Sequence, residues 1–223
     1  GAQAAVSTGT GFFNLAHCVT KDVITDDIYV CLEGRSGASK GGGVKVFERV
    51  GANYALKSSD DQIGGTGEFS EKVEGGVYVE GKGLYVVDNE YGPNSDGPTI
   101  VLINTTSDFG NHDAWYGMPG FIGDLGGLTY EASTSKLVAV SKYNSQFYKF
   151  AAFAVSDDEQ DVYPIDTKGL TQSNMMSQFW PEQGYNGIHS TTYQGNAVLL
   201  LVRYEQVQRV SPSTGAIEGG WWV

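Results

Sequence analysis

Four strongly aliphatic runs stand out in the pattern of hydrophobic and polar positions along the chain. They cover residues 28–32, 84–87, 137–140 and 198–202. A glycine, a short β-type run and a tight polar turn precede each of them, and two more β-type runs, separated by another polar turn, follow. Because the aliphatic runs are almost wholly apolar and do not alternate, they are typical of strands buried on both faces between neighbouring sheets.

This order of elements recurs four times and predicts a repeat architecture made of β-sheets. The approximate bounds of the four units are 11–57, 75–117, 126–166 and 187–223. Turns rich in Gly, Asn, Asp and Ser suit tight hairpins, and β-branched and aromatic residues are frequent in the runs between them. We therefore expect a single all-β domain that spans residues 1–223.

The recurring units resemble the blades of the β-propeller superfamily over essentially the whole chain. The resemblance is to the architecture and to no specific family, since the chain has no Trp-Asp dipeptide of the WD40 kind. It implies a propeller of about four four-stranded blades. Four blades either close a ring by themselves or form an arc that another chain or further sequence completes. A β-sandwich of similarly short strands is the alternative fold.

The charge balance narrows the classes of partner. The chain has 26 Asp and Glu residues against 14 Lys and Arg residues, for a formal net charge of -12. A surface this acidic repels phosphate backbones and anionic membranes, so no nucleic-acid partner is expected. No run of about 18 apolar residues occurs, so no membrane span is expected either.

The two cysteines, Cys18 and Cys31, lie in runs that read as the two strands of one hairpin. If the hairpin turns around Ile24 and Thr25, the cysteines lie opposite each other at the separation that a disulfide requires. Two buried thiols are the alternative. A disulfide, an acidic composition and the Asn-Thr-Thr glycosylation sequon at Asn104 together predict a secreted, extracellular glycoprotein.

The densest polar segment, residues 88–97, follows the second aliphatic run and suggests a metal site. Hard cations such as Ca²⁺ bind about six to eight oxygens, which loops rich in Asp, Asn and Gly supply. The segment therefore predicts a calcium site, and a simple solvated turn is the alternative. The candidate ligands are Asp88, Asn89, Glu90, Asn94 and Asp96.

Aromatic residues near strand ends and in loops form a second candidate site, because flat rings stack on sugars and fill protein interfaces. A histidine in an expected inner strand is placed to line a central channel. The alternative is that these side chains pack within and between blades, which is the role expected of Trp221 and Trp222. The candidate ligand-binding residues are Trp115, Tyr116, Trp180, Tyr185 and His189.

No nucleophile turn, metal triad or nucleotide-binding loop appears in the sequence, so no catalytic residue is nominated. The predicted function is a secreted, non-enzymatic binding or structural module. Its expected partner is a glycan or an extracellular protein, and an oligomer or a larger extracellular assembly is a natural setting. The alternative is a secreted propeller-type hydrolase, lactonase-like or carbohydrate-active, with a metal ion on its axis.

Overall fold

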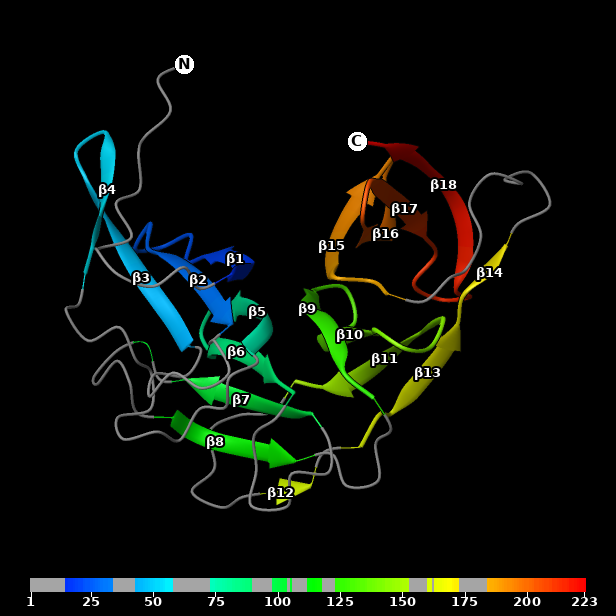
Figure 1. The fold of residues 1–223 in the computed structure, drawn as a ribbon, viewed down its shortest axis with the longest axis horizontal. Helices are drawn as coiled ribbons and strands as arrows, with labels where there is room; N and C mark the ends of the chain where they lie inside the picture. Colours follow the sequence, from blue (N-terminus) through cyan, green and yellow to red (C-terminus); the bar gives the residue numbers. More distant parts are fainter. Residues whose placement is uncertain are drawn as a thin grey trace.

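A computed structural model describes residues 15–33, 43–57, 73–89, 98–103, 105, 112–117, 123–152, 160–161, 163–172 and 184–223. The described chain consists of β-strands and turns, and it contains no helix that could cross a membrane. Its strands form four separate sheets, arranged as the blades of a β-propeller (Figure 1). The predicted all-β propeller is therefore confirmed, and the sandwich alternative is wrong.

Each blade begins with its inner strand and runs outward. Blade 1 contains β1 (Leu15–Lys21), β2 (Ile28–Glu33), β3 (Gly43–Val50) and β4 (Asn53–Leu56). Blade 2 contains β5 (Val73–Val79), β6 (Gly83–Asp88), β7 (Thr99–Ile103), β8 (His112–Gly117) and β12 (Gln160–Asp161). Blade 3 contains β9 (Leu125–Glu131), β10 (Lys136–Ser141), β11 (Gln146–Ala151) and β13 (Asp166–Gly169). Blade 4 contains β15 (Gly187–Tyr193), β16 (Asn196–Arg203), β17 (Gln206–Val210), β18 (Ala216–Trp222) and β14 (Thr171–Gln172).

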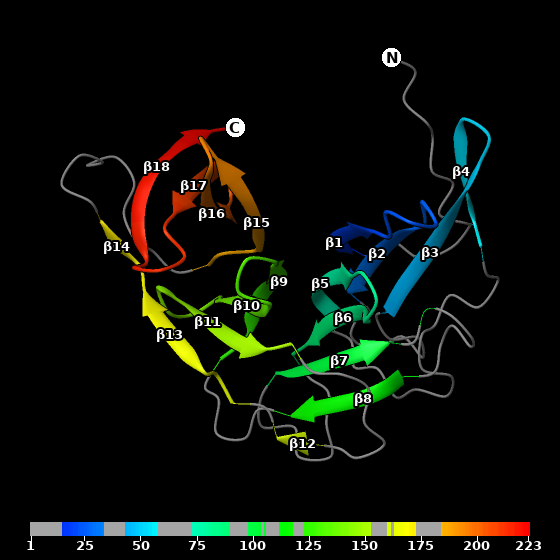
Figure 2. The same cartoon turned by 180° about the vertical axis from the view of Figure 1, so that it is seen from behind.

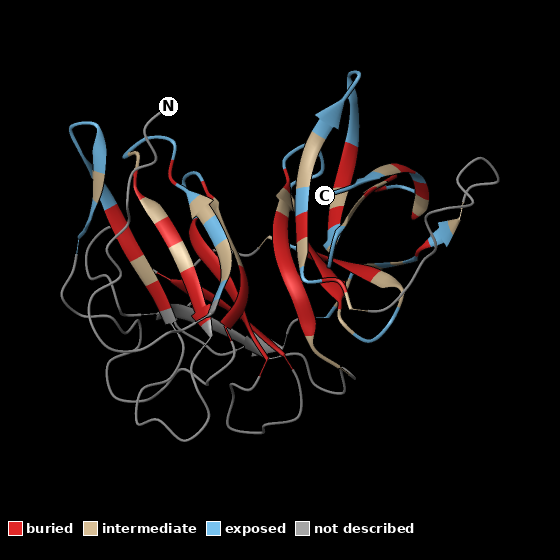
Figure 3. Ribbon diagram, turned by 45° about the horizontal axis from the view of Figure 1, so that its top comes forward, coloured by how far each residue is buried: buried red, intermediate tan, exposed pale blue. Residues whose placement is uncertain are grey.

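The core consists of three apolar layers, one between each pair of successive blades. The four aliphatic runs form the second strands β2, β6, β10 and β16, and every residue of β6 is buried. Burial therefore follows the inner part of each sheet, whereas the hairpin tips are exposed (Figure 3). In β6 and β10 the wholly apolar pattern is explained by contact with a neighbouring blade on both faces.

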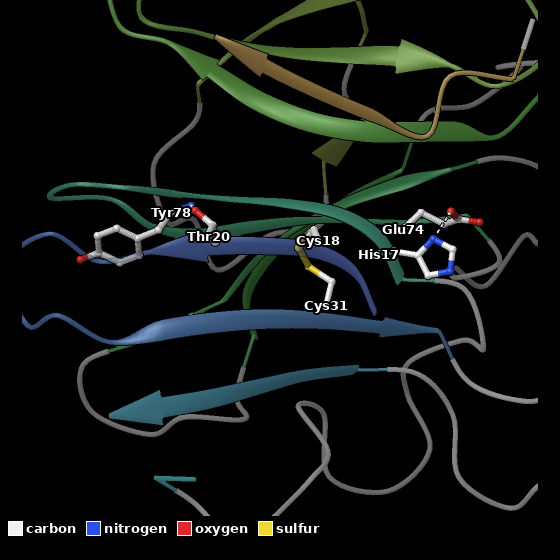
Figure 4. The surroundings of a disulfide bond; sticks show 6 residues. All are labelled: His17, Cys18, Thr20, Cys31, Glu74 and Tyr78. Carbon is white, nitrogen blue, oxygen red and sulfur yellow. Dashed lines mark hydrogen bonds and ion pairs between the residues drawn. A yellow bond between two sulfur atoms is a disulfide. The ribbon is translucent and has the colours of Figure 1, made fainter. Parts of the chain in front are cut away.

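The first hairpin has the predicted register, with Cys18 opposite Cys31. Its turn is held by Asp22, whose carboxylate accepts hydrogen bonds from the Ile24 backbone N–H at 2.8 Å and the Thr25 hydroxyl at 2.9 Å. The cysteines are joined by a disulfide with a Cα–Cα distance of 4.8 Å (Figure 4). The predicted disulfide is therefore confirmed.

The inner strands contact each other through glycines. A Cβ atom at Gly75 of β5 would lie 2.6 Å from the Cα atom of Gly127 in β9, and one at Gly127 would lie 3.1 Å from the Cα atom of Gly187 in β15. Toward blade 1, a Cβ at Gly76 of β5 would lie 2.8 Å from the Cys31 sulfur. Glycine is thus required because the neighbouring backbone occupies the space of a side chain.

Residues 160–161 and 163–172 tie the outer edges of three blades together (Figure 2). It adds β12 to blade 2 in parallel with β8, supplies β13 as the outer strand of blade 3, and adds β14 to blade 4 in parallel with β18. Two blades therefore have five strands, not the predicted four. The fourth strand of blade 3 is β13, whose residues 166–169 pair with β11.

Replacing Gly75 with alanine should destabilise the fold, because the added methyl group would overlap the backbone of Gly127. We expect the free energy of unfolding to fall by about 1–3 kcal/mol, as for other overpacked sites. Urea denaturation measures the change. Gly169→Ala is the matched control, since a Cβ there meets no atom within 4 Å. Equal stability of the two variants would contradict this account of the inner strands.

Removing the disulfide with the double substitution Cys18→Ala and Cys31→Ala should lower the free energy of unfolding by about 3 kcal/mol, the loss of loop-closure entropy for a bridge of this span. Urea denaturation with and without a phosphine reductant tests it. The wild-type protein should lose stability on reduction, and the double variant should not respond. A wild-type curve that the reductant leaves unchanged would show that the bridge contributes nothing.

Candidate functional site

Three ionisable side chains from three different blades meet where the inner strands begin. They are His17 of β1, Glu74 of β5 and Lys142, which follows β10. The His17 Nδ1 atom lies 3.1 Å from the Glu74 Oε2 atom (Figure 4), and the Lys142 ammonium group binds Glu74 Oε1. The Glu74 side chain is only 4% exposed, whereas His17 and Lys142 are each about one-fifth exposed. One buried carboxylate therefore joins two partly accessible bases.

Backbone irregularities explain why these side chains meet. The pairing of β1 with β2 shifts register between Ala16 and Cys18, and that of β5 with β6 shifts between Val73 and Gly75. His17 and Glu74 are the extra residues at these two bulges. Bulges redirect side chains and occur often beside functional sites.

A third irregularity lies at the same level in β9, where Val140 pairs with Gly127 but Ser141 pairs with Leu125. This leaves Gly126 as the extra residue. A Cβ at Gly126 would lie 3.2 Å from Cγ of Lys142 and would overlap the carbonyl oxygen of Tyr185. The glycine thus leaves room for the lysine to extend toward Glu74.

The electrostatics of the cluster keep Glu74 ionised at neutral pH. Burial is the largest influence on this carboxyl group and by itself raises its pKa. Hydrogen bonds from His17 and Lys142 outweigh burial and hold the pKa of Glu74 below its usual range. The Glu74 carboxylate faces Nδ1 of His17, so the cluster combines a link between three blades with a partly accessible histidine.

The predicted calcium ligands are not brought together among the residues that the structure describes. Asp88 is fully buried at the end of β6, where it pairs with Val73 and Thr99. The Asn89 amide is bonded on both sides to the backbone of Leu125: its Nδ2 donates to the carbonyl at 3.0 Å, and its Oδ1 accepts from the N–H at 2.9 Å. Asn89 therefore joins blade 2 to blade 3.

The other three calcium candidates, Glu90, Asn94 and Asp96, lie outside the described residues. Within the described ranges, no group of three or more His, Cys, Asp or Glu side chains is arranged to hold a metal ion. The glycosylation candidate Asn104 also lies outside the described part of the chain. The calcium site and the glycan remain predictions.

The predicted ligand-binding residues are dispersed over different blades. Tyr185 is a core residue and not a surface one: it is fully buried between blades 3 and 4, and its hydroxyl donates to Gln208 at 2.7 Å. His189 is exposed on β15, opposite Leu200. Trp115 and Tyr116 lie in β8, three strands from the inner strand of blade 2, with side chains outside the described set. Trp180 is not among the described residues.

Blade 4 exposes large aromatic side chains that the sequence analysis assigned to packing. Trp221 is 46% exposed and Trp222 is 59% exposed, so the expectation that both pack between blades is wrong. Tyr204, in the turn between β16 and β17, is 77% exposed. The centre of its ring lies 5.1 Å from the guanidinium carbon of Arg203. In the sequence, the signal of this surface was the pair of adjacent tryptophans at residues 221 and 222.

Glu74→Gln should destabilise the protein by about 2 kcal/mol at pH 7, because it leaves His17 and Lys142 without their buried counter-charge. A lowered folded-state pKa gives stability that is present above the unfolded pKa and is lost as pH falls through the folded pKa. The wild-type protein should therefore lose more stability between pH 7 and pH 3 than Glu74→Gln does. Urea denaturation at both pH values measures this, with the exposed Glu80→Gln as control. Parallel pH profiles for all three proteins would contradict it.

Comparison with known proteins supports the fold. No family model and no curated protein matches the sequence. Among solved structures, the chain resembles the glutaminyl cyclase of Myxococcus xanthus, with a TM-score of 0.54 and 12% identity over 93% of this chain and 70% of the cyclase. It also resembles a chain of a nidogen/laminin complex, with a TM-score of 0.52 and 13% identity over 94% of this chain and 81% of that one.

A third similar structure is the major allergen Mala s 1 of Malassezia sympodialis. Its TM-score is 0.50 and its identity 14%, over 88% of this chain and 60% of the allergen, so the chain spans less than two-thirds of that protein. At identities this low, the three likenesses concern the fold alone. They support a β-propeller arrangement, an architecture that proteins with very different roles share.

Proposed function

We propose that this chain is an extracellular binding module that uses the exposed aromatic end of blade 4 to bind a protein partner. The observation that carries the proposal is the exposure of Tyr204 and Trp222, which lie at the same end of adjacent strands. Gln206, two residues after Tyr204, pairs directly with Trp222. We call Tyr204, Trp222 and the adjacent Arg203 the aromatic end.

The composition of the aromatic end is that of an interface centre. Trp, Tyr and Arg dominate the residues whose truncation weakens protein complexes most, and the Trp and Tyr rings bury large areas at small entropic cost. Leaving such rings in water sacrifices their burial energy. The same rings also stack on sugar faces, so a glycan is the second candidate ligand.

Two further observations support an extracellular binding role. The Cys18–Cys31 disulfide persists most readily in an oxidising compartment such as the cell exterior. One structural neighbour is a chain of a nidogen/laminin complex, that is, an assembly of two proteins. The hydrolase alternative has no observation in its favour among the described residues, and we do not propose it.

Screening the wild-type protein against arrays of purified secreted proteins and of glycans should yield a saturable ligand. Because an interfacial Tyr or Trp commonly contributes about 2 kcal/mol or more, Tyr204→Ser and Trp222→Ser should each weaken that ligand by roughly 30-fold or more. Biolayer interferometry at submicromolar protein measures the change. Tyr163→Ser removes an exposed tyrosine elsewhere and should change nothing. A ligand that binds the two variants as tightly as the wild type would refute the assignment of this surface.

A further inference from the structure

The hairpin turn between β1 and β2 is aliphatic where the corresponding turns of the other blades are polar. Val23 and Ile24 lie in this turn and are 73% and 68% exposed. The equivalent turns of blades 2, 3 and 4 are exposed and have the sequences Glu-Gly-Lys at 80–82, Ala-Ser-Thr-Ser at 132–135 and Gln-Gly at 194–195. Because turns favour small and polar residues, the geometry of the hairpin does not account for two β-branched aliphatic residues at its tip.

Hydrogen bonds hold this aliphatic turn in one shape. The Asp22 side chain, buried beneath it, accepts from the Ile24 backbone N–H. The Asp26 N–H donates to the Asp22 carbonyl at 3.0 Å, and the Asp22 N–H donates to the Asp27 carbonyl at 2.9 Å. The turn is therefore preorganised, and little conformational entropy is lost when Val23 and Ile24 become buried in a partner.

The hairpin of β3 and β4 adds a third exposed aliphatic residue at the same end of blade 1. Val50, the last residue of β3, is 56% exposed. Its turn lies at the same end of the sheet as the β1–β2 turn, because β1 and β3 each pair antiparallel with β2. The two turns are joined by Arg49, whose Nη1 atom lies 2.8 Å from Asp26 Oδ2. We call Val23, Ile24 and Val50 the aliphatic tip.

Three exposed cations flank the aliphatic tip, and the carboxylates that pair with them are more deeply buried. Lys21 and Arg49 both bind Asp26, and Lys57 binds Asp27. The side chains of Lys21 and Lys57 are each 45% exposed and that of Arg49 is 57% exposed. Asp26 and Asp27 are only 26% and 6% exposed. Positive charge therefore faces the solvent beside the tip.

The net charge of the whole chain hides this local difference. Residues 1–57 contain six Lys and Arg against five Asp and Glu, whereas residues 58–223 contain eight against 21. Among the described residues near the tip, Glu48 is an exposed carboxylate, and the three cations outnumber it. Exposed charges are screened beyond about 8 Å at physiological ionic strength, so the acidic blades contribute little at the tip. The repulsion of anionic membranes expected from the total charge therefore does not extend to this end of blade 1.

We propose that the aliphatic tip of blade 1 inserts into the surface of a lipid bilayer with anionic headgroups, while Lys21, Arg49 and Lys57 bind lipid phosphates. Apolar side chains next to exposed cations are typical of proteins that bind at a membrane interface. A protein partner is less favoured, because Val is under-represented among the residues that stabilise protein interfaces, whereas Val and Ile enter a bilayer favourably. This membrane contact goes beyond the proposed ligand binding and does not depend on it.

The small size of the aliphatic tip predicts weak, reversible membrane binding. A single myristoyl chain binds a bilayer with an association constant of about 10⁴ M⁻¹, and three aliphatic side chains bury no more apolar surface than that chain does. We expect a comparable constant for vesicles in which about one-third of the lipid is phosphatidylserine and the rest phosphatidylcholine. Vesicles of phosphatidylcholine alone should bind roughly tenfold more weakly, because they lack the attraction for the three cations.

Cosedimentation of the full chain with these vesicles measures the binding. The double substitution Val23→Ser and Ile24→Ser should weaken it by roughly tenfold or more, through the loss of apolar burial. Val50→Ser, in the other turn, should weaken it in the same direction and tests the tip independently. Lys21→Gln with Arg49→Gln should remove most of the preference for phosphatidylserine. Urea denaturation shows whether each variant is folded.

Two matched controls lie away from blade 1. Ile165→Ser replaces an aliphatic residue that is 56% exposed between β12 and β13. Lys168→Gln replaces a partly exposed lysine of blade 3 that is also paired with a carboxylate, 2.8 Å from Asp166 Oδ1. Both variants should bind vesicles as the wild type does.

A fluorescent label at the tip distinguishes insertion from surface contact. Both native cysteines are joined in the disulfide, so Ile24→Cys supplies a single reactive thiol for an environment-sensitive nitrobenzoxadiazole dye. Its emission should shift to the blue when phosphatidylserine vesicles are added and should be quenched by lipids brominated in their acyl chains. Asn144→Cys, in the exposed turn between β10 and β11, carries the same dye as a control and should not respond.

Three outcomes overturn the proposal. They are a wild-type chain that does not sediment with phosphatidylserine vesicles at low salt, binding that the Val23 and Ile24 double variant retains in full, and a dye at position 24 that stays in water. Capture of a purified acidic protein by the tip without any vesicle binding belongs to the first outcome and assigns the tip to a protein partner instead. Tyr204→Ser should bind vesicles normally. Since the vesicles contain neither protein nor glycan, failure here leaves ligand binding by the aromatic end unaffected.

Discussion

The inner strands of this propeller approach one another so closely that backbone meets backbone, and the arrangement of the blades depends on that contact. Gly75, Gly127 and Gly187 stand at equivalent positions of successive inner strands, and a side chain at either of the first two would occupy the space of the next strand. The second strands of blades 2 and 3 can then bury both faces, because the sheets lie near enough for aliphatic side chains to fill the layers between them. At blade 1, the Cys18–Cys31 bridge lies where the other blades have a glycine and an aliphatic residue.

The same close approach produces the polar cluster. The inner strand bulges one residue before Cys18, Gly75 and Gly127, and the extra residues are His17, Glu74 and Gly126 in successive blades. In two blades the bulge directs an ionisable side chain toward its neighbour, and in the third a glycine makes space for Lys142. Asn89 adds a neutral link from blade 2 to the start of β9. Apolar layers therefore hold the sheets, and polar contacts at one end fix how successive blades meet.

The sequence predicted what depends on local pattern and failed where distant segments meet. The aliphatic second strands and the Cys18–Cys31 pair were predictable because both follow from one hairpin or one buried run. β12 and β14 are two-residue strands without an apolar pattern, and they exist only because the outer edges of blades 2 and 4 pair with them. His17 and Glu74 are 57 positions apart, and no local spacing indicates that their bulges are neighbours. Tyr185 was expected at a ligand-binding surface but is buried. The sequence around an aromatic loop residue does not indicate whether its side chain enters the core.

The open arrangement of the blades has a physical consequence for what the protein can do. In a ring whose blades are all covered, only loops and edges are available to partners, and the layers between sheets serve stability alone. Here, among the residues that the structure describes, Val202 of blade 4 and Val19 of blade 1 lie on sheet faces of the two end blades and are 39% and 69% exposed. Apolar side chains on a sheet face lower their free energy when other atoms cover them. The packing that orders the blades therefore leaves apolar side chains of the two end blades, Val19 and Val202, exposed within the described residues.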